Sequence, residues 1–176
     1  MAEIIDLYDN ARRFIRTAER TVLPQPGENK LSVHVWIVNS DEQFLLQQRV
    51  ASAKKFPNMW GQTGGGARAG EDSWACCVRE TREELGITPD HKKSIWVGTF
   101  KRPMDFVDVW LVYNDAKLGD LTLQPAEVQN VKWATLAEIE QMQATGTFIP
   151  SILPGLEIIK HFLAMERLYK QQSVVR

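Results

Sequence analysis

The sequence has few cysteines and no long apolar run, and both shortages narrow the class of protein. Its 176 residues include only two cysteines, Cys76 and Cys77, which lack the spacing of a zinc or redox motif. Adjacent cysteines rarely pair with each other, so we expect a cytoplasmic chain without structural disulfides. No stretch approaches the roughly 18 apolar residues of a membrane span. The first residues also lack the basic and apolar regions of a signal peptide.

An excess of charge of one sign is missing as well. Lys and Arg number 21 and Asp and Glu number 22, which gives a net charge of −1. This balance provides no general basic surface for DNA or for a membrane, so we expect neither as a partner. A small anionic substrate needs only local positive charge and stays open. The length is close to the roughly 150 residues of an ordinary single domain.

Hydrophobic patterning predicts a mixed sheet with a few helices packed on it. We expect strands at residues 31–38, 44–49, 95–100, 106–113 and 128–134, and helices at 73–85, 136–144 and 156–171. Residues 3–8 fit a short strand, while 12–21 fit either a helix or a second strand that forms a hairpin with it. Glycine and proline predict a loop over 57–70. The order of elements indicates one α+β domain, an α/β/α sandwich.

The predicted helix at 73–85 carries two distinct faces. A buried stripe is predicted by four residues that recur at helical spacing, Trp74, Val78, Thr81 and Leu85. On another face lie Glu80, Glu83 and Glu84, whose carboxylates repel one another at i, i+3 and i, i+4. A cation that prefers oxygen ligands, Mg²⁺ or Mn²⁺, would convert this repulsion into binding. The bare glycines before the helix would let a phosphate approach closely. A solvated acidic surface is the alternative.

Taken as a whole, residues 65–87 resemble the signature of the Nudix hydrolase family. That signature reads Gly-x5-Glu-x7-Arg-Glu-hydrophobic-x-Glu-Glu-x-Gly-hydrophobic. It is matched by Gly65, Glu71, Arg79, Glu80, Glu83, Glu84, Gly86 and Ile87, and Thr81 is the one departure. The similarity extends over residues 30–145, and the segment before the signature looks closest to the branch near isopentenyl-diphosphate isomerases.

The resemblance implies a fold and a division of the chain. We expect a Nudix domain, an α/β/α sandwich with a mixed sheet, over residues 30–150. Residues 1–29 would form an N-terminal extension, and residues 151–176 a C-terminal helix packed on the same domain. By the same analogy the protein is expected to be a homodimer, with the N-terminal 20 residues as a hairpin at the interface.

The resemblance also implies hydrolysis of a nucleoside diphosphate derivative by water and Mg²⁺, or Mn²⁺. Glu80, Glu83 and Glu84, with the carbonyl group near Gly65, would bind the metal. Glu80 is the first choice for the group that activates the water, and Glu127 the second. Arg79 would hold the carboxylates in place, and Glu71 would stabilise the junction of loop and helix.

Residues outside the acidic helix would contact the substrate. Arg49, Lys54, Lys55 and Arg68 could bind its phosphates, although a residue of this kind is more often a solvated surface charge. Trp60 could stack on a base or pack beneath the glycine loop. His34 alternates with valines in a strand and is interpreted as structural.

Two other functions remain alternatives. An isomerase of this family has a catalytic cysteine in the loop before the signature, but residues 58–64 contain none. A module that only senses an ADP-ribose-like nucleotide would have less need of the glutamates. A glycine-rich ATPase loop is excluded, because no Gly-Lys-Ser/Thr follows the glycines.

Overall fold

Strand β3 (Lys30–Val38) lies at the centre of the fold because both of its faces are covered. Val33, Val35 and Ile37 pack into one apolar cluster, and the alternate residues Trp36 and Val38 pack into another. Side chains of a strand point alternately to opposite faces, so a near-continuous apolar run indicates a strand buried on both sides.

The structure is a computed structural model that describes residues 2–174. Residues 1, 175 and 176 of the predicted segments 1–29 and 151–176 lie outside it.

The main sheet is mixed. It runs in the order β5 (Trp60–Gly61), β4 (Phe44–Arg49), β3, β8 (Asp105–Tyr113), β7 (Ser94–Arg102). In addition, β6 (Thr63–Gly66) pairs with β3, and β9 (Val128–Ala134) pairs with β4. Strands β3 and β8 are parallel, and the other pairs are antiparallel.

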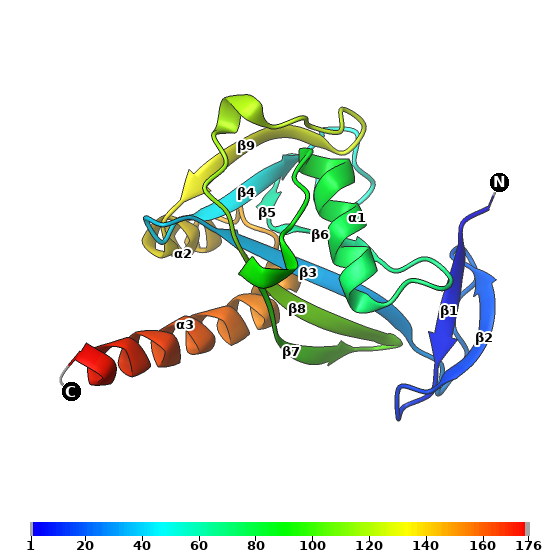
Figure 1. Cartoon of the computed structure of the whole chain (residues 1–176). Coiled ribbons are helices and arrows are strands. Elements are labelled where there is room, and N and C mark those ends of the chain that lie inside the picture. The colour runs from blue at the N-terminus through cyan, green and yellow to red at the C-terminus, as the bar shows by residue number, and fades with distance from the viewer. Residues whose placement is uncertain (1, 175–176) are drawn as a thin grey trace.

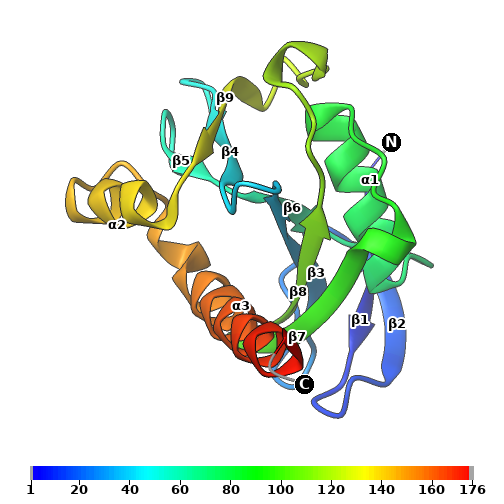
Figure 2. The same ribbon diagram turned by 60° about the vertical axis from the view of Figure 1, so that its left-hand side comes forward.

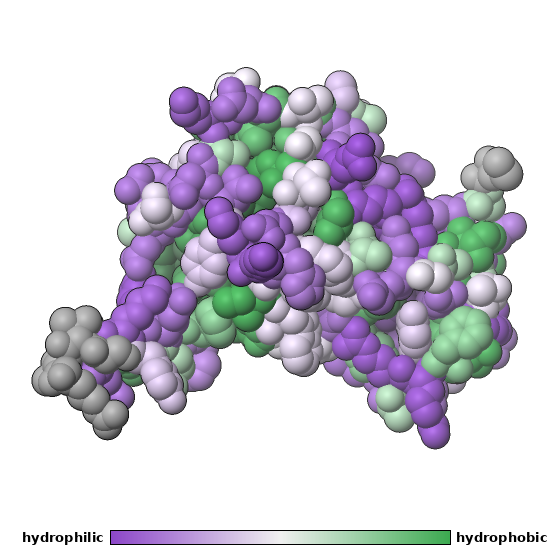
Figure 3. Space-filling view, viewed as in Figure 1, coloured by the Kyte–Doolittle hydropathy of each residue, from purple (hydrophilic) through white to green (hydrophobic). Residues whose placement is uncertain are grey.

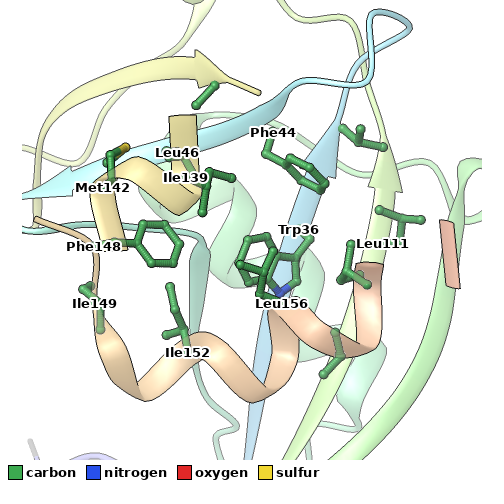
Figure 4. Close-up of a cluster of buried hydrophobic side chains, with 14 residues drawn as sticks. Trp36, Phe44, Leu46, Leu111, Ile139, Met142, Phe148, Ile149, Ile152 and Leu156 are labelled. Atoms are coloured by element: carbon green, nitrogen blue, oxygen red, sulfur yellow. The ribbon is translucent and has the colours of Figure 1, made fainter. Parts of the chain in front are cut away.

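Helices cover the two faces of this sheet (Figure 2). Helix α1 (Ser73–Leu85) lies on one face, and α2 (Leu136–Ala144) and α3 (Leu153–Val174) lie on the other. Short 3-10 turns lie at His91–Lys93, Leu118–Asp120 and Pro150–Ile152. On the α2–α3 side, Trp36 lies beside Leu156 at the centre of the cluster (Figure 4). The predicted α/β/α arrangement with a mixed sheet is confirmed.

The N-terminal residues form a separate two-stranded sheet beside α1 (Figure 1). Strand β1 (Ile4–Tyr8) pairs antiparallel with β2 (Phe14–Glu19), so residues 14–19 form a strand and not a helix. The hairpin attaches to the loop before α1, where Ala69 N donates to Ile4 O at 2.8 Å and Gly70 N donates to Asp6 Oδ2 at 2.8 Å. Hydrophobic surface is visible over the hairpin at the right of Figure 3.

Two local predictions differ from the structure. Residues 57–70 are not all loop, because the glycine-rich β6 pairs with residues 32–35 of β3. The stripe on α1 is also rotated: Trp74 and Val78 are half-buried, while Cys76 and Cys77 are fully buried. The thiols are small and apolar, which lets α1 approach the sheet on that side. Among residues 2–174, no helix is both long and apolar enough to cross a membrane.

Candidate active site

Helix α1 is fixed at both ends, and this sets the direction of its glutamates. Asp72 caps the first turn, where its Oδ1 accepts from Ala75 N at 2.7 Å. Gly86 ends the helix with φ of 73°, a left-handed conformation that favours glycine. Glu80 and Glu84, one turn apart, therefore lie on the side of α1 that contacts the glycine strand β6.

The carboxylate of Glu80 rests against the backbone of Gly65. A Cβ atom at position 65 would lie 2.2 Å from Glu80 Oε1, far inside van der Waals contact. Only glycine leaves room for the carboxylate at this point. Burial raises the pKa of Glu80, although its hydrogen bond with Arg79 opposes the shift.

Glu84 is the most deeply buried of the three glutamates, with 2% of its surface exposed. Its Oε2 accepts from Gln47 Nε2 at 2.9 Å and from Gly64 N at 3.3 Å. Burial, and then the charge of Glu80, raise the pKa of Glu84 to about 8. Two carboxyl groups are thus held close together in a buried place, which favours a nearby positive charge.

Arg79 connects the acidic residues to one another and to the glycine strand. It donates to Glu71 at 2.6 Å, to Glu80 at 2.9 Å and to Glu83 at 3.2 Å. Its Nη2 also donates to the carbonyl oxygen of Gly66 at 3.0 Å. A planar guanidinium with five donors can hold several oxygens in fixed positions at once, and an ammonium group cannot. Arg79 and Glu71 therefore position the other groups.

The residues around Glu80 and Glu84 suit a hard divalent cation. Their carboxylates, the carbonyl oxygen of Gly65 and the side-chain oxygen of Gln47 are all oxygen donors. Gln47 Oε1 is buried without a hydrogen-bond partner within residues 2–174, so it can still serve a ligand. However, within residues 2–174 no group of three or more His, Cys, Asp or Glu side chains is arranged so that it could hold a metal ion. Glu83 instead pairs with Arg79 and Arg68.

A cavity of about 450 Å³ lies along the glycine strand. Four basic side chains contribute to its wall, Arg20, Arg49, Lys55 and Arg102. None of the described residues that line it is acidic, so its electrostatic environment favours an anion. Gln47 belongs to the wall and also contacts Glu84, which places the cavity next to the buried glutamates.

The predicted site residues divide into two groups. Glu80, Glu84, Arg79 and Gly65 come together, Glu83 reaches them only through Arg79 among the described residues, and Arg49 and Lys55 line the cavity. Lys54, Trp60 and Arg68 are not among the residues that line it. The ring of Trp60 is covered by Lys132, whose Nζ is 4.7 Å from its centroid, and Arg68 pairs with Glu3. Trp60 also packs against the apolar cluster on the α2–α3 side of the sheet.

Glu127 lies in the turn directly before β9, exposed and outside the cavity wall. It is near enough to Glu84 for its charge to contribute to the raised pKa of Glu84, after burial and Glu80. Three further residues at the site were not singled out from the sequence: Arg20, Gln47 and Arg102. Gln47 carries a weak signal, since it is a buried position of β4 where the run of three apolar residues gives way to polar ones.

Comparison with known protein sequences gives three findings. A family model described as NUDIX domain matches residues 28–153. An uncharacterized Nudix hydrolase of Listeria innocua is 38% identical over 147 residues, 82% of this chain and 87% of that protein. An isopentenyl-diphosphate Δ-isomerase of Streptomyces avermitilis is 33% identical over 156 residues, 84% of this chain and 78% of that enzyme.

A solved structure supports the fold. The protein DR0079 of Deinococcus radiodurans superposes with a TM-score of 0.75 at 23% identity, covering 90% of this chain and 98% of that one.

Proposed function

Since the chain belongs to the Nudix hydrolase family, whose members act on diphosphate bonds, we propose that it hydrolyses the diphosphate linkage of a nucleoside diphosphate derivative with Mg²⁺. Water attacks phosphorus, the bond from phosphorus to the bridging oxygen breaks, and two phosphate-bearing products leave. Mn²⁺ is the alternative cation. A homodimer and a cytoplasmic location stay predictions.

One observation carries this proposal. Glu80 and Glu84 are held together against the glycine strand, next to a cavity whose charged wall residues, among residues 2–174, are all basic. Carboxylates favour a cation, and the basic wall favours an anion. A metal complex of a phosphate chain satisfies both requirements at once.

The contacts of the individual residues support the following roles. Glu80 and Glu84, with the carbonyl oxygen of Gly65, would hold the cation, and Glu83 would join them by releasing Arg79. Bound there, the cation supplies positive charge for the phosphoryl oxygens in the transition state. Arg49 and Lys55 bind the phosphates from the cavity wall. Glu80 accepts a proton from the attacking water, and Glu127 is the second candidate for this step.

A turnover screen with and without Mg²⁺ tests the proposal. The substrates are nucleotide sugars, ADP-ribose, NADH, dinucleoside polyphosphates, oxidised nucleoside triphosphates and isopentenyl diphosphate, with products separated by chromatography. We expect Mg²⁺-dependent cleavage of a diphosphate bond in at least one. Tight binding of a nucleotide without any turnover would instead identify a sensing module.

Isomerisation of isopentenyl diphosphate is the second candidate, favoured by the 33% identity to the Streptomyces enzyme. The structure offers no accessible thiol for it within residues 2–174. Cys76 and Cys77 are both buried on α1, and burial raises the pKa of both thiols. Neither lines the cavity. Isomerised product in the same screen, without hydrolysis, would favour this second candidate.

A further inference from the structure

The basic residues of the cavity form two pairs at opposite ends of the glycine strand. Arg49 and Lys55 adjoin one another, because Arg49 Nε donates to Lys55 O at 3.0 Å, and they lie toward Gly61. Arg20 and Arg102 lie toward Gly66, where β3 begins. The buried glutamates contact Gly64 and Gly65, between the two ends.

Arg20 comes from the N-terminal hairpin, directly after β2, and packs flat on the strand. A Cβ at position 66 would lie 2.9 Å from both Nη1 and Nη2 of Arg20, so a side chain there would push the guanidinium group away from the strand. Arg20 Nη2 donates to Gly66 O at 2.7 Å. Its Nε lies 2.8 Å from Glu3 Oε2 and forms an ion pair with it, but the N–H does not point at this oxygen well enough for a hydrogen bond. Lys30 Nζ fixes the same point by donating to Arg20 O at 3.1 Å.

Arg102 reaches this end of the cavity from β7. Its Nε donates to Asp105 Oδ2 at 3.1 Å, and Asp105 Oδ1 in turn accepts from Ser32 Oγ at 2.9 Å. Ser32 is paired with Gly66 in the sheet, so both guanidinium groups are anchored around the same residue pair. Within residues 2–174, neither Nη1 of Arg20 nor Nη1 of Arg102 donates a hydrogen bond to any acceptor.

Between its two ends, the described part of the wall adds no negative charge, and its histidine is neutral near pH 7. His34 lines the cavity between them and is 4% exposed. Burial, and then the charge of Arg102, lower the pKa of His34 to about 3, so its imidazole is neutral near pH 7. Arg20 and Arg102 are each paired with a carboxylate outside the cavity wall, Glu3 and Asp105 respectively, but among the described residues each keeps Nη1 free. Each can therefore donate a charge-assisted hydrogen bond to a phosphate oxygen in the cavity.

We propose that Arg20 and Arg102 form a phosphate subsite, and that the substrate carries a phosphate chain long enough to contact both basic pairs. The N-terminal hairpin then supplies part of the active site. This inference rests on the proposed function, because it takes the hydrolysed bond to lie between the two pairs. It favours substrates with three or more phosphates over substrates with two.

Isothermal titration without metal, at fixed ionic strength, tests the subsite apart from catalysis. The probes are inorganic tripolyphosphate and inorganic phosphate. The variants are Arg20→Gln and Arg102→Gln, with Arg16→Gln as the matched control, since Arg16 lies on β2 and pairs with Glu28 outside the cavity wall. Loss of charge-assisted hydrogen bonds should weaken tripolyphosphate binding about 10-fold or more in either variant. Arg16→Gln should bind as the wild type does.

Equal tripolyphosphate affinity in all three variants would overturn the subsite. Arg102 belongs to a different element from Arg20, so its variant decides the question should Arg20→Gln fail to fold. The screen for hydrolysis is independent of this titration. An inactive protein whose tripolyphosphate binding needs both arginines would refute the proposed function and support the subsite. An active protein whose tripolyphosphate binding is the same in the two arginine variants would support the proposed function and refute the subsite.

Discussion

The Glu80 carboxylate lies so close to the backbone of Gly65 that any side chain at position 65 would displace it. The added Cβ of an alanine would lie 2.2 Å from Oε1 and 2.4 Å from Cδ of Glu80. Glu80 is also held by Arg79, so it cannot move away without breaking that ion pair. The glycine thus determines where the carboxylate lies.

Gly65→Ala is therefore expected to impair catalysis more than folding. Displacement of a catalytic group by about 1 Å can lower the rate about 100-fold, and we expect a fall in kcat on this scale. The measurement is kcat for whichever substrate the screen identifies, together with the midpoint of thermal unfolding. Gly119→Ala is the control, since a Cβ there meets no atom within 4 Å. Equal kcat in both variants would contradict this account.

Glu84→Gln should separate activity from stability. Glutamine keeps the shape and can still accept from Gln47 and Gly64, but it removes a negative charge that the proposed cation needs. We expect Mg²⁺-dependent turnover to fall at least about 100-fold, as when other charge-stabilising groups are lost. The free energy of unfolding should be unchanged or higher, because burial already raises the pKa of Glu84 to about 8, and a neutral amide there carries no cost of ionisation.

Measured kcat and urea unfolding check both parts. Glu157→Gln, an exposed glutamate paired with Lys160 on α3, is the matched control. Near-normal Mg²⁺-dependent rates in Glu84→Gln would refute the metal assignment.

The sequence predicts the acidic helix well and the cavity poorly, for a physical reason. Glu80, Glu83 and Glu84 lie within five residues on one helix, so helical periodicity alone places them together. Arg20 and Arg102 are distant in sequence, and they line one cavity because β6, β3, β8 and β7 are successive neighbours in the sheet. Nothing local in either residue indicates this proximity. Likewise, periodicity predicts that α1 has a buried face, but the shape of the sheet decides which residues enter it.

The buried imidazole of His34 should make the protein sensitive to acid. Its pKa is lowered to about 3 in the folded protein, against an ordinary value near 6.5. Between these values the unfolded chain binds more protons than the folded one, so stability falls as the pH drops below about 6.5. The largest slope for one group is about 1.4 kcal/mol per pH unit.

Urea unfolding of His34→Gln between pH 7.5 and pH 4.5 measures this contribution. We expect a flatter dependence on pH than in the wild type, while His161→Gln, at an exposed position, should keep the wild-type slope. An identical slope in His34→Gln and the wild type would show that other groups cause the acid sensitivity.

The ion pair between Arg12 and Asp108 should hold the hairpin to the main sheet. Asp108 has 2% of its side chain exposed and receives hydrogen bonds from Arg12 Nη1 at 2.8 Å and from Thr99 Oγ1 at 2.6 Å. Burial alone would raise the pKa of Asp108, but these hydrogen bonds outweigh it and hold the pKa below its ordinary value. Arg12→Ala leaves a buried carboxylate without its cation, and we expect a loss of about 1–3 kcal/mol in the free energy of unfolding.

Arg13→Ala is the control for Arg12→Ala. Arg13 lies in the same turn and is 80% exposed, and its ion pair with Asp9 is local, so its loss should have little effect. The stabilisation from Asp108 needs its ionised form, so it is present above pH 4 and lost as the pH falls through the lowered pKa. The difference between wild type and Arg12→Ala in urea unfolding should therefore shrink toward pH 2. A difference that stays constant from pH 7 to pH 2 would show that Arg12 acts by packing on Phe106, 5.8 Å from the ring centroid, and not by its charge.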